Sequence, residues 1–391
     1  PEKFLREMIE SVEAQTYKNW ELCIADGSVS RDTEEIIEKY AVQNHRIKYL
    51  RLKENEGIVG NSNQALEICT GEYVGLLDHD DILSEDALYE VVQAINEKNM
   101  PGLIYSDEDK VTMDSSQYFE PHFKLDFNLD LLRSNNYICH FCVIKKEILD
   151  QIGGFRKEFE GAQDYDLILR SVEKAEKIVH IPKILYHWRS HQNSTAENPE
   201  SKLFAYKAGK RAIEEHLKRM GEEGMVGYTH YPGFYHVKYK LQKNDKVIVV
   251  IHGEESEREV KRCRKSICRS AGYDNLSFIF ADDWNKLQLD GLNGEYLLFV
   301  NCKVKMISHD WMQEMLALCQ RKDVGIVGIK MYNKKDETIY HAGIREGQEG
   351  YLFEGFPREE VGYFHRESLQ QDVDAVTKDF MMISMEDFEI V

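Results

Sequence analysis

Hydrophobic residues in the first half of the chain alternate between two spacings, one typical of amphipathic helices and one typical of buried strands. Helical spacing is found at 4–12, 34–42, 57–68 and 84–96. Short apolar runs of the strand type are found at 20–25, 47–52, 73–77 and 103–105. Strands and helices that alternate over short connections predict the α/β class, with a mixed, mostly parallel sheet and helices on both faces.

The same alternation resumes after 111–136, a stretch with many aromatic residues and little periodicity. Strands are predicted at 138–144 and 181–188, and helices at 145–152, 165–176 and 199–220. Glycine and proline then gather in 221–245, which predicts a linker, and a new buried-type strand begins at 247. We therefore expect one domain at 1–220, a linker at 221–245 and a second α/β domain at 246–391.

The second domain repeats landmarks of the first in a shortened form. Tyr17-Lys18-Asn19 is echoed by Tyr273-Asp274-Asn275, and Gly71-Glu72-Tyr73 by Gly294-Glu295-Tyr296. Where the first copy continues to Asp78-His79-Asp80, the second has Asn301-Cys302-Lys303. An ammonium group at that position repels a cation, so we expect a degenerate second copy that binds no metal and diphosphate.

Three carboxylates follow the apolar run at 73–77 within four positions, namely Asp78, Asp80 and Asp81. Carboxylates so close repel one another unless a cation lies among them, and Mg²⁺ and Mn²⁺ prefer such oxygen ligands. The alternative is a solvated acidic turn that caps the helix beginning near Ser84. The residues alone leave both interpretations open.

Composition narrows the function classes. The net charge of −19 excludes non-specific nucleic-acid binding, because no overall positive field attracts phosphates. The eight cysteines are scattered, as in reduced cytosolic proteins, and the CxxC run at 139–142 is predicted to be core. We find no signal peptide and no apolar run of the length that a membrane span requires. A cytoplasmic location is expected; the basic side of helix 199–220 is a solvated face or a contact with the inner face of the cell membrane.

Seven short motifs occur in one order over the first domain. They are Gln15-Thr16-Tyr17-Lys18-Asn19-Trp20-Glu21-Leu22, Asp26-Gly27-Ser28, Asn55-Glu56-Gly57-Ile58 with Asn63, Asp78-His79-Asp80-Asp81, Gly153-Gly154-Phe155, Gln163-Asp164-Tyr165-Asp166-Leu167, and Tyr186-His187-Trp188-Arg189-Ser190-His191. In these motifs residues 1–220 resemble a family 2 glycosyltransferase of the GT-A fold, the nucleotide-diphospho-sugar transferase fold. Tandem-domain bacterial enzymes, often called rhamnosyltransferases, are the most similar members. Residues 246–391 resemble the same family in a degenerate, C-terminally truncated form, and the family's first strand is expected before Pro1.

The resemblance implies nucleotide-binding roles for five residues. Asp26 would accept a hydrogen bond from a uracil or thymine base, although Asp-Gly-Ser is also a common turn. Gly57 and Asn63 would lie beneath the nucleotide, and Gly57 alternatively only caps its helix. Asp78 would meet the ribose or a metal-bound water, and Arg189 would lie near the phosphates.

The resemblance also implies a metal site and a catalytic base. Asp80 and His191 would ligate Mn²⁺ or Mg²⁺, with His187 as the alternative histidine ligand. Asp164 would take the proton of the acceptor hydroxyl, and its alternative role is that of a helix N-cap. The acids at 107–109 either touch a sugar or form a solvated loop.

The expected function is therefore that of a metal-dependent, inverting glycosyltransferase. The donor would be a UDP- or dTDP-linked sugar, and the acceptor a glycan or a lipid-linked oligosaccharide of bacterial cell-surface polysaccharide. Two alternatives stay open, a non-catalytic glycan-binding or scaffold protein and a metal-dependent phosphoesterase or nucleotidyltransferase.

Overall fold

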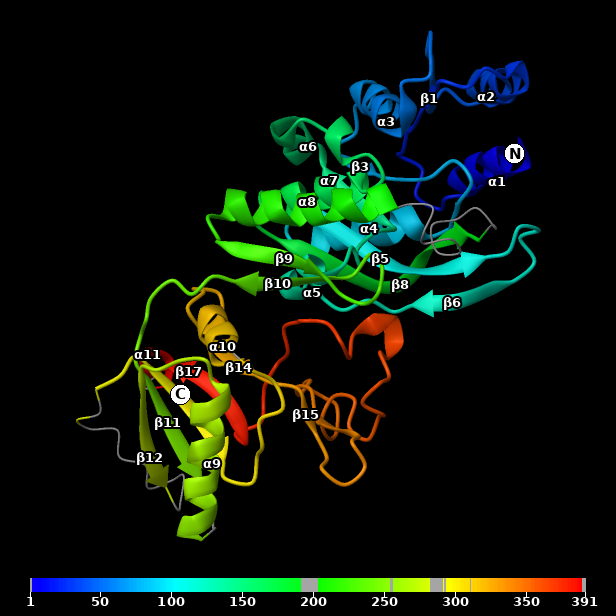
Figure 1. Cartoon of the computed structure of the whole chain (residues 1–391). Coiled ribbons are helices and arrows are strands. Elements are labelled where there is room, and N and C mark those ends of the chain that lie inside the picture. The colour runs from blue at the N-terminus through cyan, green and yellow to red at the C-terminus, as the bar shows by residue number, and fades with distance from the viewer. Residues whose placement is uncertain are drawn as a thin grey trace. The chain divides into compact units, whose positions relative to one another are not determined.

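A computed structural model describes residues 2–190, 203–253, 256–281, 291, 293–309 and 311–388. The chain forms two compact units, the first from Pro1–Gly221 with Val226–His236 and the second from Glu222–Met225 with Val237–Val391 (Figure 1). The residues predicted as a linker form two paired strands, β9 (Gly224–Tyr228) and β10 (Tyr235–Tyr239). The boundaries expected from the sequence, at 220 and 246, stay a proposal.

The first unit alternates helices and strands over most of its length. Its elements are α1 (Glu2–Glu13), β1 (Leu22–Asp26), α2 (Arg31–Gln43), β2 (Ile47–Arg51), α3 (Gly57–Glu67), β3 (Tyr73–Gly75), β4 (Ile82–Leu83), α4 (Ala87–Glu97), β5 (Leu103–Val111), β6 (Tyr118–His122), α5 (Leu129–Ser134), β7 (Cys142–Lys145), α6 (Lys146–Ile152), η1 (Lys157–Phe159), α7 (Gln163–Val172), β8 (Ile178–Arg189) and α8 (Leu203–Met220).

The strands of the first unit make two sheets. β1 pairs with β2 in parallel, and a six-stranded sheet has the order β3-β7-β5-β8-β4 with β6 added to β5. In the larger sheet β5 and β8 run parallel, whereas β7, β4 and β6 are antiparallel to their neighbours. The predicted mixed α/β sheet is thus confirmed, with a smaller parallel share than expected because β7, β4 and β6 run the other way.

One core of the first unit joins helices α1, α2 and α4 to the sheets. Leu5, Met8, Ile9 and Val12 lie on one face of α1, at the helical spacing that the sequence shows, and all are buried. They pack with side chains of α2, β4 and β8 in a single cluster. Successive side chains of a strand point to opposite faces. Leu22 and Ile24 of β1 therefore pack into this core, whereas Cys23 points to the face that α3 covers.

Strand β5 is longer than its apolar pattern predicted. The acids at 107–109 lie within the strand and not in a loop after it, and residues 107 and 109 are buried. Tertiary contacts explain the difference, because Asp107 accepts a hydrogen bond from Lys124 N at 2.8 Å and pairs with His180. Carboxylates with such partners can occupy buried strand positions.

The second unit is built on a five-stranded sheet. Its elements are β11 (Val247–His252), α9 (Glu257–Ser270), β12 (Leu276–Ala281), β13 (Tyr296–Asn301), α10 (Trp311–Cys319), β14 (Ile326–Gly328), β15 (Met331–Tyr332), β16 (Ile339–His341), η4 (Tyr363–His365), β17 (Phe380–Ser384) and α11 (Met385–Phe388). The strand order is β12-β11-β13-β17-β14, with β11 parallel to both neighbours and β17 antiparallel to both of its own.

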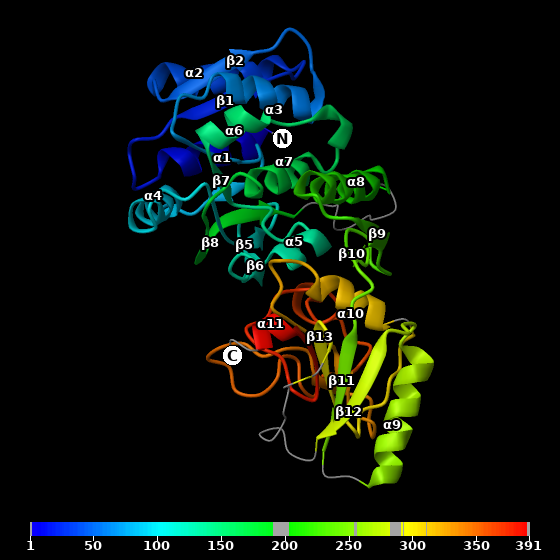
Figure 2. The ribbon, with the colours of Figure 1, turned by 90° about the vertical axis from the view of Figure 1, so that its left-hand side faces the viewer.

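Both faces of this sheet are covered. Every residue of β11 is buried, as is typical of a parallel strand between two layers. Val247, Val249 and Ile251 pack on the face that carries α9 and α10, and α9 lies along that face in Figure 2, while Ile248 and Val250 pack on the other. At the end of β13, the Asn301 amide donates to Asp379 Oδ1 at 2.9 Å.

Candidate active site

The acidic turn after β3 holds its three carboxylates in different environments. Asp78 is exposed, Asp80 is partly exposed, and Asp81 is buried. Asp81 Oδ1 accepts the Arg189 backbone N–H at 2.7 Å, and its Oδ2 accepts the Tyr186 hydroxyl at 2.5 Å. Burial, and then the nearby charge of Asp78, raise the pKa of Asp81 to about 7. Asp81 therefore anchors the turn to β8, while Asp78 faces outward.

Asp78 and Asp81 meet His140 in a group that suits a metal ion. Each of these three residues offers one ligand atom, and the three atoms lie within 4.8 Å of one another. Carboxylate oxygens and an imidazole nitrogen are a donor set that fits Mn²⁺, and the oxygens suit Mg²⁺. Asp80 is not in this group, and its Oδ1 lies 3.9 Å from His79 Nδ1. The predicted ligand His191 lies outside the described residues.

His140 is the site residue that the sequence did not reveal. Its ring stacks on Tyr186 at 4.7 Å, its Nδ1 lies 3.1 Å from Glu108 Oε2, and its Nε2 lies 3.9 Å from Asp78 Oδ2. Burial opposes the charged ring, but contacts with Cys139 and Glu108 raise the pKa of His140 above its usual range. The core packing predicted for 139–142 holds for Phe141 and Cys142, which are buried. An imidazole within this apolar run was the feature of the sequence that could have pointed to His140.

Asp164 lies at the second position of α7, beside this group. The N-cap of α7 is Ala162, so Asp164 does not hold the N-cap position that was its alternative. Its Oδ2 accepts the Asn136 amide at 2.9 Å and lies 3.8 Å from Cys139 Sγ. Burial raises the pKa of Asp164, with the charge of Asp78 adding to the shift and that of His140 opposing it. The fold therefore brings the predicted base close to the acidic turn.

Asp26 ends β1 as a buried carboxylate. Its Oδ1 accepts the Ser28 N–H at 2.8 Å, and its Oδ2 accepts the Tyr49 hydroxyl at 3.1 Å and the Arg51 guanidinium. Burial opposes ionisation, but the hydrogen bonds and the Arg51 charge hold the pKa of Asp26 below its usual range. The turn after it packs closely on the start of α3, because a Cβ on Gly27 would lie 2.9 Å from the Asn55 Cα.

Gly57 and Asn63, predicted beneath the nucleotide, have structural contacts. Gly57 starts α3 with a φ of +79°, a conformation that strongly favours glycine, and its N–H donates to Asn55 Oδ1 at 2.9 Å. The Asn63 side chain accepts from Phe155 N at 2.8 Å and donates to Phe155 O at 2.9 Å. Asn63 thus ties α3 to the turn at Gly154, and its predicted place beneath the nucleotide stays a prediction.

Arg189 has structural contacts as well. Its side chain is fully buried, and its guanidinium pairs with Glu7 at 2.7 Å. The remaining donors reach Asp80 O at 2.6 Å, Thr112 O at 3.2 Å and Ser115 Oγ at 2.8 Å. These contacts tie Arg189 to the acidic turn and to the segment at 112–115, and its predicted place near the phosphates stays a prediction.

The alternative ligand His187 is committed to partners as well. Its Nδ1 lies 2.6 Å from Asp109 Oδ1, and its Nε2 lies 3.0 Å from Ser84 Oγ. Both ring nitrogens of His187 thus have hydrogen-bond partners, and its alternative role as a metal ligand stays a prediction. The contact with His187 gives the buried Asp109 carboxylate its partner. Burial opposes the ionisation of Glu108, but Lys124, His122 and His140 lower its pKa.

Comparison with known proteins assigns the first unit. Residues 2–153 match the family model described as glycosyl transferase family 2. This region belongs to glycosyl transferase family 2. The predicted family is therefore confirmed, and the match includes the acidic turn and His140 and ends before Asp164.

Relatives extend the likeness over nearly the whole chain. An uncharacterised protein of Sinorhizobium fredii, y4gI, is 36% identical over 99% of this chain and 47% of its own length. The O-antigen biosynthesis protein RfbC of Myxococcus xanthus is 31% identical over 91% of this chain and 30% of its own length. The chain thus spans less than half the length of these relatives. A solved structure of S. aureus TarS in complex with UDP-GlcNAc aligns with 55% of this chain and 63% of its own, at 19% identity and a TM-score of 0.45.

Within the described residues, no helix is long and apolar enough to cross a membrane.

Proposed function

We propose that this chain is a metal-dependent, inverting glycosyltransferase. It transfers a sugar from a UDP- or dTDP-linked donor to an oligosaccharide or lipid-linked acceptor in the synthesis of bacterial cell-surface polysaccharide. The family 2 domain and the likeness to an O-antigen biosynthesis protein over 91% of the chain support this proposal. Because the chain spans only part of its relatives, the activity of the whole protein belongs to the proposal.

The environment of Asp164 is the observation that carries the proposal. A carboxylate whose pKa is raised by burial takes up a proton more readily than an exposed one, as a general base requires. The Asn136 amide fixes one of its oxygens and so orients the group. As the acceptor oxygen bonds to the anomeric carbon, its proton passes to Asp164, and the bond from that carbon to the diphosphate breaks. Attack opposite the leaving group inverts the anomeric centre.

The acidic turn lies on the donor side of this reaction. If a divalent cation were bound there, it would supply positive charge against the negative charge that develops on the departing diphosphate. Asp78, Asp81 and His140 are the described residues that would hold it, and Asp80 and His191 remain candidate ligands. The Asp26 carboxylate, kept ionised by hydrogen bonds from Ser28 and Tyr49 and by the Arg51 charge, would accept the N–H of a uracil or thymine ring.

Asp164→Asn tests the proposal, with Asp126→Asn as the matched control because the Asp126 side chain is 96% exposed. Transfer from UDP- and dTDP-sugars is measured with and without Mn²⁺, and nucleotide binding is followed by thermal shift. We expect D164N to lower kcat by about 10²–10⁴-fold without changing nucleotide binding. Turnover that survives in D164N contradicts the role of Asp164. Acceptor-independent hydrolysis by the wild type would favour a phosphoesterase, and glycan binding without transfer would favour a binding protein.

A further inference from the structure

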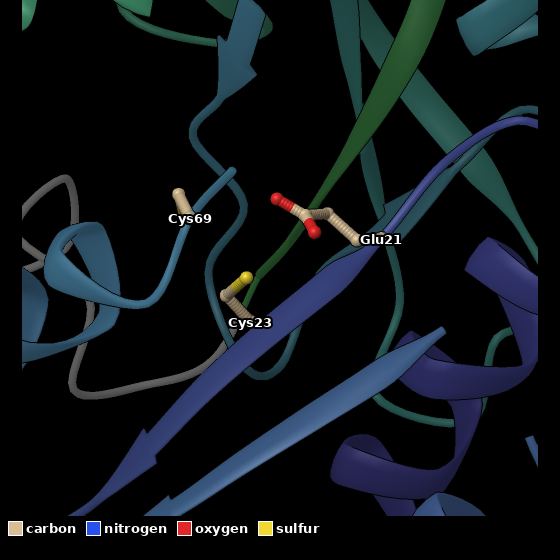
Figure 3. A group of neighbouring side chains, drawn as sticks. All are labelled: Glu21, Cys23 and Cys69. Carbon is tan, nitrogen blue, oxygen red and sulfur yellow. The ribbon is translucent and has the colours of Figure 1, made fainter. Parts of the chain in front are cut away.

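Three potential metal ligands converge on the side of β1 that faces α3, in a group that the proposed reaction does not use. Glu21 immediately precedes β1 and Cys23 lies within it, so the two side chains, two positions apart, point to the same face. Cys69 comes from the segment that follows α3. Figure 3 shows the Glu21 carboxylate and the Cys23 thiol directed toward one space beside Cys69. One ligand atom from each residue lies within 4.8 Å of the other two.

The Glu21 carboxylate is held firmly in this position. Its Oε1 accepts the backbone N–H of Thr70 at 2.5 Å and of Gly71 at 2.9 Å, and its Oε2 lies 2.5 Å from Lys48 Nζ. These bonds lower the pKa of Glu21 to about 2 against the effect of burial. Carboxylates that bind metals are commonly hydrogen-bonded by outer partners in this way, which fixes their orientation.

The two thiols are free and close to each other. Their sulfur atoms lie within 4.8 Å of each other, and each thiol donates to a backbone carbonyl, Cys23 Sγ to Ile68 O at 3.8 Å and Cys69 Sγ to Ala65 O at 3.2 Å. Both residues are half-buried, so solvent ions can reach them. The neighbouring Cys69 thiol and burial raise the pKa of the Cys23 thiol, whereas the neighbouring Cys23 thiol and the Lys48 charge lower the pKa of the Cys69 thiol. A thiol that ionises more easily is a better metal ligand, since the thiolate is the form that binds.

We propose that Cys23 and Cys69, with Glu21 beside them, bind a thiophilic divalent cation of the Zn²⁺ class. Two sulfur donors and one oxygen form a set that selects such an ion over Mg²⁺ or Mn²⁺, which prefer oxygen. Binding replaces the two thiol protons by two metal–sulfur bonds and releases both protons to solvent. A water molecule completes the tetrahedral set.

A metal ion at this site would stabilise the part of the first unit that, in the proposed function, binds the sugar donor. Cys23 lies in the strand that ends at Asp26, and Cys69 precedes the strand β3 that leads to the acidic turn. A metal bound by both joins these two segments, which are distant in sequence. Because only the folded chain brings the three ligands together, binding raises the thermal stability of the protein.

Co²⁺ is the spectroscopic probe for this site, and Zn²⁺ is the competitor. The full chain, reduced and freed of metal by a chelator, is titrated with Co²⁺ while thiolate-to-cobalt charge-transfer absorption is followed. We expect one equivalent with thiolate absorption, its displacement by Zn²⁺, and a rise in Tm on Zn²⁺ addition. Cys23→Ser and Cys69→Ser each abolish the thiolate absorption, and Glu21→Gln weakens Zn²⁺ binding by about 10-fold or more.

Two controls separate this site from the rest of the protein. Cys268→Ser, at an exposed cysteine, and Asp80→Asn, in the acidic turn, should leave the Co²⁺ spectrum unchanged. Thermal unfolding of the metal-free serine variants at the wild-type Tm shows that they fold. Co²⁺ binding without thiolate absorption, or absorption that persists in the double variant C23S/C69S, overturns the proposal. A Cys23–Cys69 disulfide that forms in air-exposed protein while Zn²⁺ fails to bind to the reduced form also overturns it.

Discussion

Replacing Arg189 by methionine separates a structural role for this residue from a role in phosphate binding. Methionine keeps an unbranched apolar stem but is shorter and has no donor, so Glu7, Asp80 O and Thr112 O each lose a hydrogen-bond partner. Breaking a buried ion pair costs about 3–5 kcal/mol, and we take the lower end because the Glu7 side chain is 23% exposed. A loss of about 3 kcal/mol corresponds to a fall in Tm of about 6–12 °C for a unit of this size.

The assay is differential scanning calorimetry of the full chain, combined with UDP binding at a temperature where the variant is folded. Lys3→Met is the matched control, because Lys3 pairs with the same Glu7 at 3.3 Å from an exposed position. K3M should change the stability by less than about 1 kcal/mol. An R189M protein that melts at the wild-type temperature but binds UDP much more weakly would refute the buried role and restore the phosphate contact.

Gly154→Ala should destabilise the first unit more than Gly153→Ala in urea unfolding, because both have positive φ but only Gly154 would place a Cβ 2.6 Å from Asn63 Oδ1; equal losses would contradict the contact. Asn63→Ala should cost about 1–3 kcal/mol in the same measurement, since it leaves two backbone groups unpaired. His216, whose pKa is lowered by burial and by the Arg133 charge, binds more protons when unfolded, so stability should fall as the pH drops below about 6.5. His216→Gln should flatten that dependence, and an unchanged pH profile would rule out His216 as its source.

The sequence alone determined the architecture and the chemical class. Helical spacing and short apolar runs located most helices and strands of the first unit, because burial of a helix face or of a whole strand leaves a pattern of apolar residues in the sequence. The cluster of Asp78, Asp80 and Asp81 at a strand end raised a cation site as one of two interpretations, which the residues alone left open. Motif order then indicated family 2, which the match over residues 2–153 bears out.

Only the tertiary structure decided which polar side chains face the site and which support it. Arg189, Asn63 and His187 lie in motifs beside the acidic turn, yet internal acceptors and donors use their hydrogen-bonding groups. His140, in an apolar run, instead turns its ring toward Asp78. A sequence motif does not show which way its side chains point, because the direction of a buried polar side chain depends on partners from distant segments. The Glu21–Cys23–Cys69 group has the same origin, since only the packing of α3 on β1 brings its third ligand to the other two.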